Sequence, residues 1–469
     1  MPYNSFEHYP MSWKPDREEL TYPYYASLAA KLENDIVHGI LAENTMLPPQ
    51  RELADFLDLS LSTVTKAYKI CEEKGLIYGK VGRGTFVTNG CVNKTIVTEE
   101  REGMIEMGQT LPFYEYNVIV SQIASEILKA PKSHTLFEYS YPLGTPRQQE
   151  AAKRWLSLHG MDVPRENIYM ASGAQNALAL VLMSLFKPGD KIATDAFTYP
   201  NFIGLANMLN IQLIGLKGDE NGILPYALEQ ACRNSKINGI YLMPACANPT
   251  NIVMGYERRA EVSKIIKKYH LILIEDDTYA FLSDNKQQPI SVNIPEQSVY
   301  INSMSKALCA GLRVAYICFP ERMRKQLENA IYNVNLKTPS LNVEIATEMI
   351  FSGIYEEIAS RKKEEALKRN EIFCQYFPEI PSGDIKSAFY KWLHLPKGCT
   401  GRAFEMMCRE RGVNVYGSER FCVSENFGIN AVRISISSPP GIEVLNKGLK
   451  IVREVYENIS QSEEASYIF

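Results

Sequence analysis

The stretch that decides the fold is Tyr300–Ile317, YINSMSKALCAGLRVAYI. An apolar, strand-like run ends in Asn302-Ser303-Met304-Ser305-Lys306, and a turn of small residues then leads to Leu312-Arg313. A lysine held at the end of a strand can form a Schiff base with an aldehyde, and hydroxyls beside an arginine suit a phosphate dianion. The same residues would also fit a surface lysine in a serine-containing loop, so the rest of the chain has to decide.

Strand-like apolar runs alternate with helical stretches before this point. The runs are Asn167–Met170, Lys191–Thr194, Gln212–Leu216, Gly239–Met243, Leu271–Ile274 and Ser298–Asn302. Such alternation predicts an α/β fold with a mainly parallel sheet, in which ligands bind beyond the carboxyl ends of the strands. From about residue 341 onward we expect a smaller part, beginning with a long charged helix, Glu344–Asn370, whose charge run Arg361–Glu365 faces solvent.

Three motifs follow the earlier strands. Ser172-Gly173-Ala174-Gln175 lies between a strand and a helix, and small residues at a helix N-terminus leave backbone N–H groups free for a phosphate. Tyr199 comes just past a strand end, where an aromatic ring can stack on a flat ligand, although a core position is the commoner role for one aromatic. Asn248-Pro249 predicts a turn from which the Asn248 amide can reach a ring hydroxyl.

Two charged motifs follow later strands. Glu275-Asp276-Asp277 ends an apolar strand, and three adjacent acids repel one another unless one meets a cation such as a protonated pyridinium nitrogen. A metal site is the alternative, but no histidine or further acidic pair has suitable spacing nearby, so we expect none. Arg433 interrupts the apolar run Ala431–Ile436. Since a buried unpaired guanidinium is costly, we expect it to meet an anion, and a ligand carboxylate would allow a bidentate pair.

The motif order SGAQ, TYP, NPT, DDTY, SMSK with GLR, and VRIS resembles the fold-type I aminotransferases of class I/II over residues 105–469. The resemblance implies a domain that binds pyridoxal 5'-phosphate (PLP), with a large part at about 105–340 and a small part at about 341–469. In that family pattern Lys306 forms a Schiff base with PLP, Asp276 pairs with its pyridine nitrogen and Tyr199 stacks on its ring. Asp276 is preferred to Asp277 because Asp-x-x-Tyr is the family spacing.

The resemblance also implies contacts for the remaining groups of the cofactor and for a ligand. Tyr279 and Asn248 would bond the phenolic oxygen, and Arg433 would take an amino-acid carboxylate. The residues that would surround the phosphate are Gly173, Ala174, Gln175, Ser303, Ser305 and Arg313. Two positions depart from the family pattern: Gln149 stands where an arginine is usual, and Asn251 stands where a glycine follows Asn-Pro-Thr.

Residues 14–88 carry a different pattern, that of a helix-turn-helix followed by a hairpin. Pro48-Pro49 opens a short helix, Gln50–Leu57, and Ser60 is a good N-cap for a further helix that runs to Lys74 and ends at Gly75. The side chains expected in the core of these two helices are Leu53, Ala54, Leu57, Val64, Ala67, Tyr68 and Cys71. Two β-rich runs around a basic, glycine-rich tip then predict a hairpin wing over residues 76–87.

The sequence LPPQRELADFLDLSLSTVTKAYKICEEKGLI, followed by VGRGTFV, resembles a GntR-type winged helix-turn-helix, which implies binding to double-stranded DNA. A small helical domain that binds protein is the alternative. Arg51 matches a family residue that contacts the DNA backbone. The other residues expected at the DNA are Ser62, Thr63, Thr65, Lys66, Lys69, Arg83 and Gly84. Leu61 and Thr65 stand where many members carry arginine, the commonest reader of guanine, so the base preference stays open.

Composition fits an intracellular protein. The chain has 469 residues, 45% of them hydrophobic, and no apolar run of transmembrane length. The N-terminus resembles no signal peptide, and ten singly scattered cysteines argue for a reducing compartment. We therefore expect a cytoplasmic protein without a membrane partner, and with a linker at residues 89–104. The net charge of −4 gives no hint of nucleic acid, but over residues 62–88 five Lys/Arg stand against two acids.

A GntR-type winged helix followed by an aminotransferase-like domain resembles the MocR/GabR family of bacterial regulators. That resemblance implies a PLP-dependent transcriptional regulator, active as a head-to-tail homodimer on a double-stranded operator. It would sense a small amine or amino acid through Schiff-base exchange at Lys306. Two alternatives stay open: a working aminotransferase with an accessory DNA-binding domain, and a DNA-binding repressor whose PLP domain is only a dimerisation scaffold.

Overall fold

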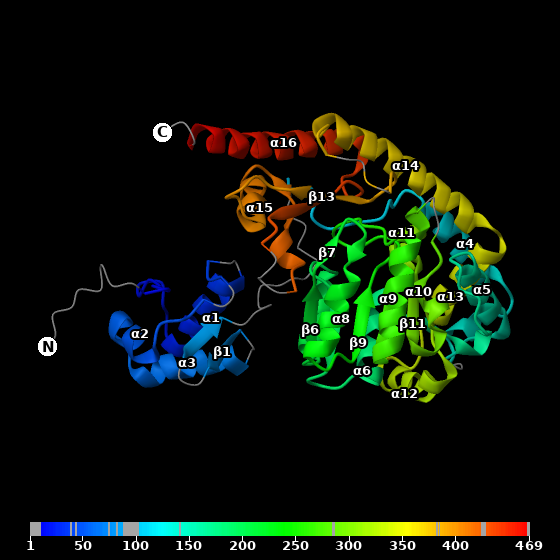
Figure 1. Cartoon of the computed structure of the whole chain (residues 1–469), viewed down its shortest axis with the longest axis horizontal. Helices are drawn as coiled ribbons and strands as arrows, with labels where there is room; N and C mark the ends of the chain where they lie inside the picture. The colour runs from blue at the N-terminus through cyan, green and yellow to red at the C-terminus, as the bar shows by residue number, and fades with distance from the viewer. Residues whose placement is uncertain are drawn as a thin grey trace. The chain divides into compact units, whose positions relative to one another are not determined.

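The computed structural model describes residues 11–37, 40–42, 45–73, 76–80, 83–87, 103–139, 142–283, 287–380, 383, 385–423 and 428–466. The chain divides into two compact units, Met1–Thr95 and Ile96–Phe469. In Figure 1 the first unit is blue, and the second runs from cyan to red. Of the expected linker 89–104, only residues 103 and 104 lie among the described ones. Lys74 and Gly75, the expected end of the third helix, lie outside the described residues.

The first unit is a helical bundle with a two-stranded wing. Its elements are α1 (Tyr24–Val37), α2 (Gln50–Leu57), α3 (Leu61–Glu73), β1 (Ile77–Lys80) and β2 (Gly84–Val87). Asp58 ends α2 in the left-handed conformation, at φ 48°, and the Ser60 hydroxyl accepts a hydrogen bond from the backbone N–H of Thr63 at 3.2 Å. Strands β1 and β2 pair antiparallel. All seven side chains expected in the core of α2 and α3 are buried there.

The second unit is built on a seven-stranded sheet with the order β4-β12-β11-β10-β9-β5-β6. Its strands are β4 (Ile168–Ala171), β5 (Lys191–Asp195), β6 (Gln212–Leu216), β9 (Gly239–Leu242), β10 (Ile272–Asp276), β11 (Ser298–Ser303) and β12 (Ala315–Cys318). The six strands expected from the sequence are all present, each displaced by at most two residues. The antiparallel strand β12 was not foreseen; it pairs with both β11 and β4.

Helices cover both faces of this sheet, which Figure 1 shows in green. The helices of the large part are α4 (Asn117–Lys129), α5 (Pro146–Ser157), α6 (Ala174–Leu185), α7 (Pro200–Met208), α8 (Pro225–Asn234), α9 (Tyr256–Tyr269), α10 (Ile290–Asn293), α11 (Met304–Ala307), α12 (Arg324–Val334) and α13 (Ser340–Phe351). Successive strand residues point to opposite faces. Leu273 of β10 therefore packs with residues of α8 and α9, whereas Ile274 packs in the cluster that includes α6, α12 and α13.

The small part is a three-stranded antiparallel sheet with helices packed on it. The sheet has the order β13 (Tyr390–His394), β16 (Ala431–Ser435) and β15 (Tyr416–Gly417), and its helices are α14 (Ile354–Tyr376), α15 (Gly401–Glu410) and α16 (Gly441–Ser466). Strand β3 (Ile105–Glu106), which we placed in the large part, pairs with β14 (Val413–Asn414) and packs in the core of the small part. The first described strand of the second unit thus belongs to its small part.

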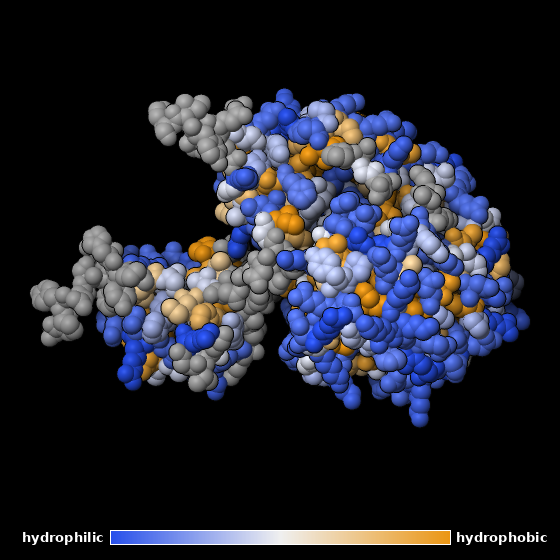
Figure 2. All heavy atoms as spheres, in the orientation of Figure 1, coloured by the Kyte–Doolittle hydropathy of each residue, from blue (hydrophilic) through white to orange (hydrophobic). Residues whose placement is uncertain are grey.

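The single helix expected over Glu344–Asn370 is wrong. The structure has two helices there, α13 and α14, because Gly353 adopts the left-handed conformation, at φ 77°, and so breaks the helical run. The expectation that the whole charge run Arg361–Glu365 faces solvent is also wrong, since Lys362 is completely buried. Figure 2 shows a mostly hydrophilic face, and no helix among the described residues is long and apolar enough to cross a membrane.

Candidate functional site

A cavity of about 360 Å³ lies at the carboxyl ends of the parallel strands of the central sheet. Tyr199, Asn248, Asp276 and Lys306 reach it from the ends of the neighbouring strands β5, β9, β10 and β11. Of the predicted cofactor and ligand residues, all except Gly173 line it: Ala174, Gln175, Tyr199, Asn248, Asp276, Tyr279, Ser303, Ser305, Lys306, Arg313 and Arg433. The structure therefore brings into one cavity residues that lie far apart in the sequence.

Lys306 lies in α11, the single helical turn that follows β11. Burial, and to a smaller extent the positive charges of Arg433, Lys362 and Arg313, lower the pKa of its ammonium from 10.5 to about 7. Its Nζ donates a hydrogen bond to the backbone carbonyl of Thr110. An amine with a pKa near 7 is neutral in a large fraction of molecules at neutral pH, which is the form that attacks a carbonyl carbon.

Asp276 is buried at the end of β10 and accepts hydrogen bonds on both oxygens. The Thr278 hydroxyl and backbone N–H donate to Oδ1 at 2.6 and 3.1 Å, and the Tyr241 hydroxyl donates to Oδ2 at 3.1 Å. Burial raises the pKa of Asp276, whereas these three hydrogen bonds oppose that rise by stabilising the charged form. The arrangement fixes a carboxylate that can face a cationic group in the cavity.

Ser303, Ser305 and Arg313 form a cluster of hydrogen-bond donors on one wall of the cavity. The Arg313 Nη1 donates to the Ser305 Oγ at 3.0 Å, and the Ser303 Oγ donates to the Ser305 Oγ at 3.2 Å. Gly173 precedes α6 at φ 85°, and a Cβ there would lie 2.2 Å from the Arg313 Nη2. Glycine at this position therefore allows the guanidinium to lie directly against the N-terminal turn of α6, where positive charge and free N–H groups suit an anion.

Arg433 is buried in β16 and is held by neutral acceptors. Its Nη1 donates to the Asn248 Oδ1 at 2.6 Å, and its Nη2 donates to the Gly108 carbonyl at 2.7 Å. Its Nε is buried without a hydrogen-bond partner, and among the described residues no acidic group forms an ion pair with it. The ring of Phe421 lies 4.6 Å from the guanidinium carbon. A buried cation with an unused donor is suited to a ligand carboxylate.

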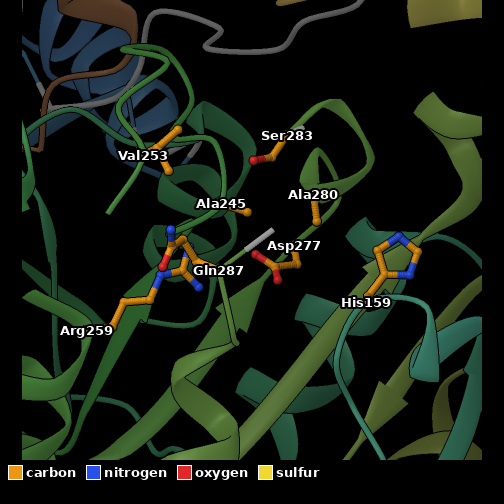
Figure 3. A pocket seen from close by; sticks show the side chains of 8 residues that line it. All are labelled: His159, Ala245, Val253, Arg259, Asp277, Ala280, Ser283 and Gln287. Atoms are coloured by element: carbon orange, nitrogen blue, oxygen red, sulfur yellow. The ribbon is translucent and has the colours of Figure 1, made fainter. Parts of the chain in front are cut away.

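The two aspartates at the end of β10 face different cavities. Asp277 lines a second, small cavity of about 20 Å³, where Figure 3 shows it between Arg259 on one side and His159 on the other. Burial raises the pKa of Asp277 to about 7, and its Oδ1 has no hydrogen-bond partner. A cavity of this size holds about one water molecule. No group of three or more metal-ligating side chains occurs among the described residues.

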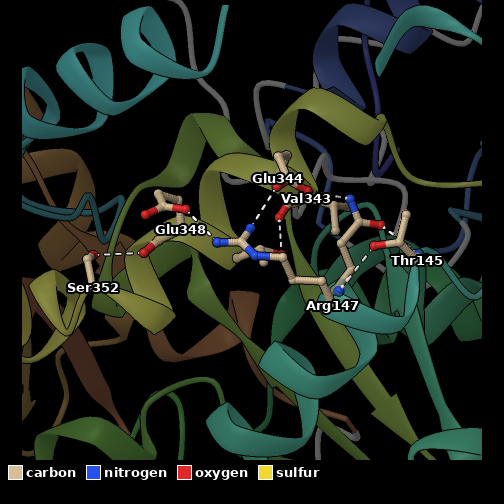
Figure 4. Close-up of polar contacts among 8 residues, drawn as sticks. Thr145, Arg147, Val343, Glu344, Glu348 and Ser352 are labelled. Carbon is tan, nitrogen blue, oxygen red and sulfur yellow. Dashed lines mark hydrogen bonds and ion pairs between the residues drawn. The ribbon is translucent and has the colours of Figure 1, made fainter. Parts of the chain in front are cut away.

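The two departures from the aminotransferase pattern have structural counterparts. Asn251 adopts the left-handed conformation, at φ 61°, which asparagine tolerates better than most residues, and its amide donates to the Tyr390 carbonyl. Gln149 lies in α5 and does not line the large cavity. Its neighbour Arg147 instead joins α5 to α13, because its guanidinium lies between Glu344 and Glu348, at 2.7 and 2.6 Å (Figure 4).

Several residues of the site were not foreseen from the sequence. Three of these residues have no distinctive signal in the sequence. The Thr278 and Tyr241 hydroxyls donate hydrogen bonds to Asp276, and the Lys362 ammonium donates to the backbone carbonyl of Lys306. The segment after β3 also contributes to the cavity, through Gln109, Thr110, Leu111, Pro112 and Tyr114. The sequence reveals those site residues that follow a strand, such as Lys306, or that interrupt an apolar run, such as Arg433.

In the first unit, the residues expected to contact DNA lie in α3 and the wing, except Arg51, which lies in α2. All of these side chains are exposed except that of Thr63, which is half-buried and whose Oγ1 shares a hydrogen bond with the Ser60 Oγ at 2.8 Å. The Lys66 ammonium lies 4.0 Å from the centre of the Tyr25 ring. The exposed residues are Arg51, Ser62, Thr65, Lys66, Lys69, Arg83 and Gly84.

Comparisons with known proteins give each unit a counterpart. Residues 24–87 match the model of the bacterial regulatory proteins of the gntR family, and residues 104–446 match that of aminotransferase class I and II. The fold and the site thus define a helix-turn-helix regulator joined to an aminotransferase-like domain. The chain is 37% identical, over 98% of its length and 100% of the relative's, to the uncharacterized HTH-type transcriptional regulator YdeF of Bacillus subtilis (strain 168). It belongs to the MocR/GabR-type family of HTH-type transcriptional regulators.

Solved structures confirm the fold of the second unit. An archaeal alanine:glyoxylate aminotransferase is 25% identical, with a TM-score of 0.70, over 76% of this chain and 91% of that one. The α-aminoadipate aminotransferase LysN of Thermus thermophilus, complexed with N-(5'-phosphopyridoxyl)-L-leucine, is 22% identical, with a TM-score of 0.68, over 77% of this chain and 94% of that one. The expectation of a fold-type I, class I/II domain with a mainly parallel sheet and a GntR-type winged helix is therefore confirmed.

Proposed function

We propose that this transcriptional regulator binds PLP in the cavity at the strand ends and senses a small amine or amino acid there by exchange at Lys306. The observation that carries the proposal is the shared cavity, in which a lysine with a pKa near 7, a fixed carboxylate and an anion-binding cluster line one space. The aminotransferase family match and the phosphopyridoxyl compound named for LysN support the same cofactor.

The residues fit PLP group by group. Lys306 offers the amine for its aldehyde, Asp276 offers a carboxylate for its ring nitrogen, and Ser303, Ser305 and Arg313 offer donors for its phosphate. Gly173, Ala174 and Gln175 would complete the phosphate site, because they lie at the N-terminus of α6, where backbone N–H groups suit an anion. Tyr199 would lie on the ring, with Tyr279 and Asn248 near its hydroxyl. When bound, PLP supplies an aldehyde that bonds to primary amines and a ring that withdraws electrons.

The ligand contacts follow from the same geometry. If PLP is bound, the Lys306 amine and a ligand amine would compete for its aldehyde carbon, and a bound ligand would leave the lysine free. The unused Nε of Arg433 can hold a ligand carboxylate, while its other two donors stay on Asn248 and Gly108. A ligand switches the protein only through its different affinity for two conformations of the chain.

The operator contacts are proposed for α3, the wing and Arg51 of α2. Arg51, Ser62, Thr63, Thr65, Lys66, Lys69, Arg83 and Gly84 would meet the duplex. Recognition by a helix in the major groove requires that its N-terminal residues reach base edges, and Ser62 and Thr65 are exposed there. Basic side chains on the same face would contact phosphates.

A head-to-tail homodimer in the cytoplasm is the proposed working form. In the second unit, α4 and the segment after it expose four large apolar residues that a second copy could cover: Val118, Leu128, Phe137 and Tyr139. The described cysteines form no disulfide bond with one another, which agrees with a reducing compartment. Sedimentation of the purified protein tests the dimer, which should have twice the 53.1 kDa of the chain.

The deciding experiment is the visible absorption spectrum of the purified protein and of Lys306→Ala, titrated with amines and amino acids. We expect wild type to show a PLP band that the variant lacks or shows displaced, and one class of ligand to shift it. The absence of a band in wild type supplied with PLP would contradict the cofactor.

Sustained transamination is the second candidate function, because the groups it uses line the same cavity. Repeated formation of an oxo acid from an amino acid would show it. Spectral shifts that depend on the ligand, without formation of an oxo acid, would indicate that the protein senses the ligand but does not transaminate it. If Lys306→Ala retains an unchanged DNA response to every ligand, the second unit is only a scaffold.

A further inference from the structure

In the first two turns of α3, Lys66 is the one side chain of a type that reads bases through paired hydrogen bonds. Helix α3 has the sequence LSTVTKAYKICEE, without Arg, Asn or Gln, and its two glutamates lie at its far end. Arginine or lysine reads guanine, Asn or Gln reads adenine, and Glu or Asp accepts from cytosine. At the end of the helix that enters the groove, only small hydroxyls, methyl-bearing side chains and lysine remain for base contacts.

The hydroxyls on this face already have partners within the protein. The Thr65 Oγ1 donates to the Gln50 Oε1 at 2.8 Å, and the Ser62 Oγ shares a hydrogen bond with the Ser60 Oγ at 2.8 Å. The Lys66 ammonium lies over the Tyr25 ring, toward α1. Each of these contacts draws polar groups toward the protein, which leaves the apolar atoms of the face for the bases.

Leu61 and Thr65 supply those apolar atoms. Leu61 is the first residue of α3, its side chain is 42% exposed, and it takes no part in the core of the first unit. Thr65 is exposed and carries a methyl group beside its bonded hydroxyl. Residues four apart lie on one face of a helix, about 6 Å apart along its axis. That separation corresponds to about two steps of a DNA duplex.

We propose that Leu61 and Thr65 read the 5-methyl groups of two thymines in each operator half-site. The major groove displays this methyl group only at thymine, so apolar contact with it distinguishes T·A from the other pairs. The inference rests on the proposed reading of DNA by α3 and adds the chemistry of the site that is read.

The test begins with the full-length protein and a library of duplexes with a randomised segment of about 40 base pairs, long enough for two half-sites one or two helical turns apart, from which tight binders are selected. In a selected duplex each thymine is then replaced singly by deoxyuridine, which removes only the 5-methyl group. Wild type should lose affinity about fourfold at two positions per half-site, as expected for one buried methyl group. Elsewhere the replacement should have no effect.

Two variants assign the positions. Thr65→Ser removes only the methyl group and keeps the hydroxyl that bonds Gln50, so it should lose sensitivity to deoxyuridine at one position and keep it at the other. Leu61→Ala should show the reverse pattern. Met406→Ala is the matched control, because Met406 is an exposed apolar residue that lies in α15 of the second unit. The deoxyuridine sensitivity of this variant should equal that of wild type.

The outcomes separate this inference from the proposed function. If the selected duplexes bind tightly but no replacement by deoxyuridine lowers the affinity, thymine reading is wrong and DNA binding is still supported. The same conclusion follows if α3 contacts invariant guanines in these duplexes. Failure to select any duplex would contradict the proposed DNA reading and this inference with it.

Discussion

The ammonium of Lys362 lies 3.4 Å from the backbone carbonyl oxygen of Lys306 and also donates a hydrogen bond to the carbonyl of Leu308. Lys362 belongs to α14, the long helix of the small part, and is completely buried. Its positive charge is one of three that lower the pKa of Lys306. A helix of the small part thus places a cation directly behind the lysine of the candidate site.

Replacing Lys362 with methionine should raise the pKa of Lys306, because one of the neighbouring positive charges is removed. The pH profile of the rate at which PLP-free protein takes up PLP reports this pKa through the fraction of neutral amine. The midpoint should move to higher pH in Lys362→Met and stay in place in Lys368→Met, an exposed lysine of the same helix. A slower rate with an unmoved midpoint would show that Lys362 only supports the structure.

The free energy of unfolding of the PLP-free protein should depend on pH through Lys306. Its pKa is about 7 in the folded protein, below the ordinary value of 10.5 that it regains on unfolding. The unfolded chain therefore binds more protons between pH 7 and 10.5, and wild type gains stability as pH rises through that window. Relative to Lys306→Met, the gain should be at most about 1.4 kcal/mol per pH unit. Urea unfolding of both proteins from pH 7 to 10 measures this gain. If the free energies of unfolding of wild type and Lys306→Met change in parallel with pH, the prediction is contradicted.

Tyr241→Phe should weaken the binding of PLP by about tenfold, because a hydrogen bond to a charged group contributes about 1.5 kcal/mol or more. The change removes only the hydroxyl that donates to Asp276. Tyr316→Phe is a matched control: Tyr316 is buried in the same sheet, and its hydroxyl has no hydrogen-bond partner. Equilibrium titration of both variants with PLP measures the contribution of the Tyr241 hydroxyl. Equal affinities of the two variants for PLP would show that this hydroxyl does not contribute to binding.

Arg433→Met should distinguish amino acids from plain amines. The variant loses the guanidinium that would hold a carboxylate, so the affinity for an amino-acid ligand should fall about thirtyfold or more. The affinity for the corresponding decarboxylated amine should change little. Spectral titration with such pairs of ligands measures the difference. An equal loss of affinity for the amino acid and for its decarboxylated amine would show that Arg433 does not bind the ligand carboxylate.

The parts of the site that the sequence revealed share one property: they interrupt an apolar pattern. Lys306, Asp276 and Arg433 stand out because charged groups at strand ends or inside strands need partners. Tyr241 could not be recognised, because an aromatic residue inside a buried strand has the pattern of an ordinary core residue. Lys362 was hidden among four charged neighbours, since only the packing of α14 decides which of them faces inward.

The same limit applies to the fold. The strands and the two helices of the helix-turn-helix follow from apolar periodicity and from proline, serine and glycine signals. Neither β3 nor β14 could be predicted, because each has only two residues and neither shows a periodic pattern. Their pairing depends on a contact between segments that lie far apart in the sequence, as Ile105 and Val413 do.

The pairing of β3 with β14 joins the small part to the segment that leads into the cavity. Among the described residues of the second unit, β3 is the first strand, and the segment after it runs along β16 to Thr110, whose carbonyl accepts the hydrogen bond from Lys306. The backbone N–H of Ser435 fastens this segment to Met107 on the way. A rotation of the small part relative to the central sheet would therefore carry β3 with it and act on the Thr110 carbonyl that accepts the hydrogen bond from Lys306.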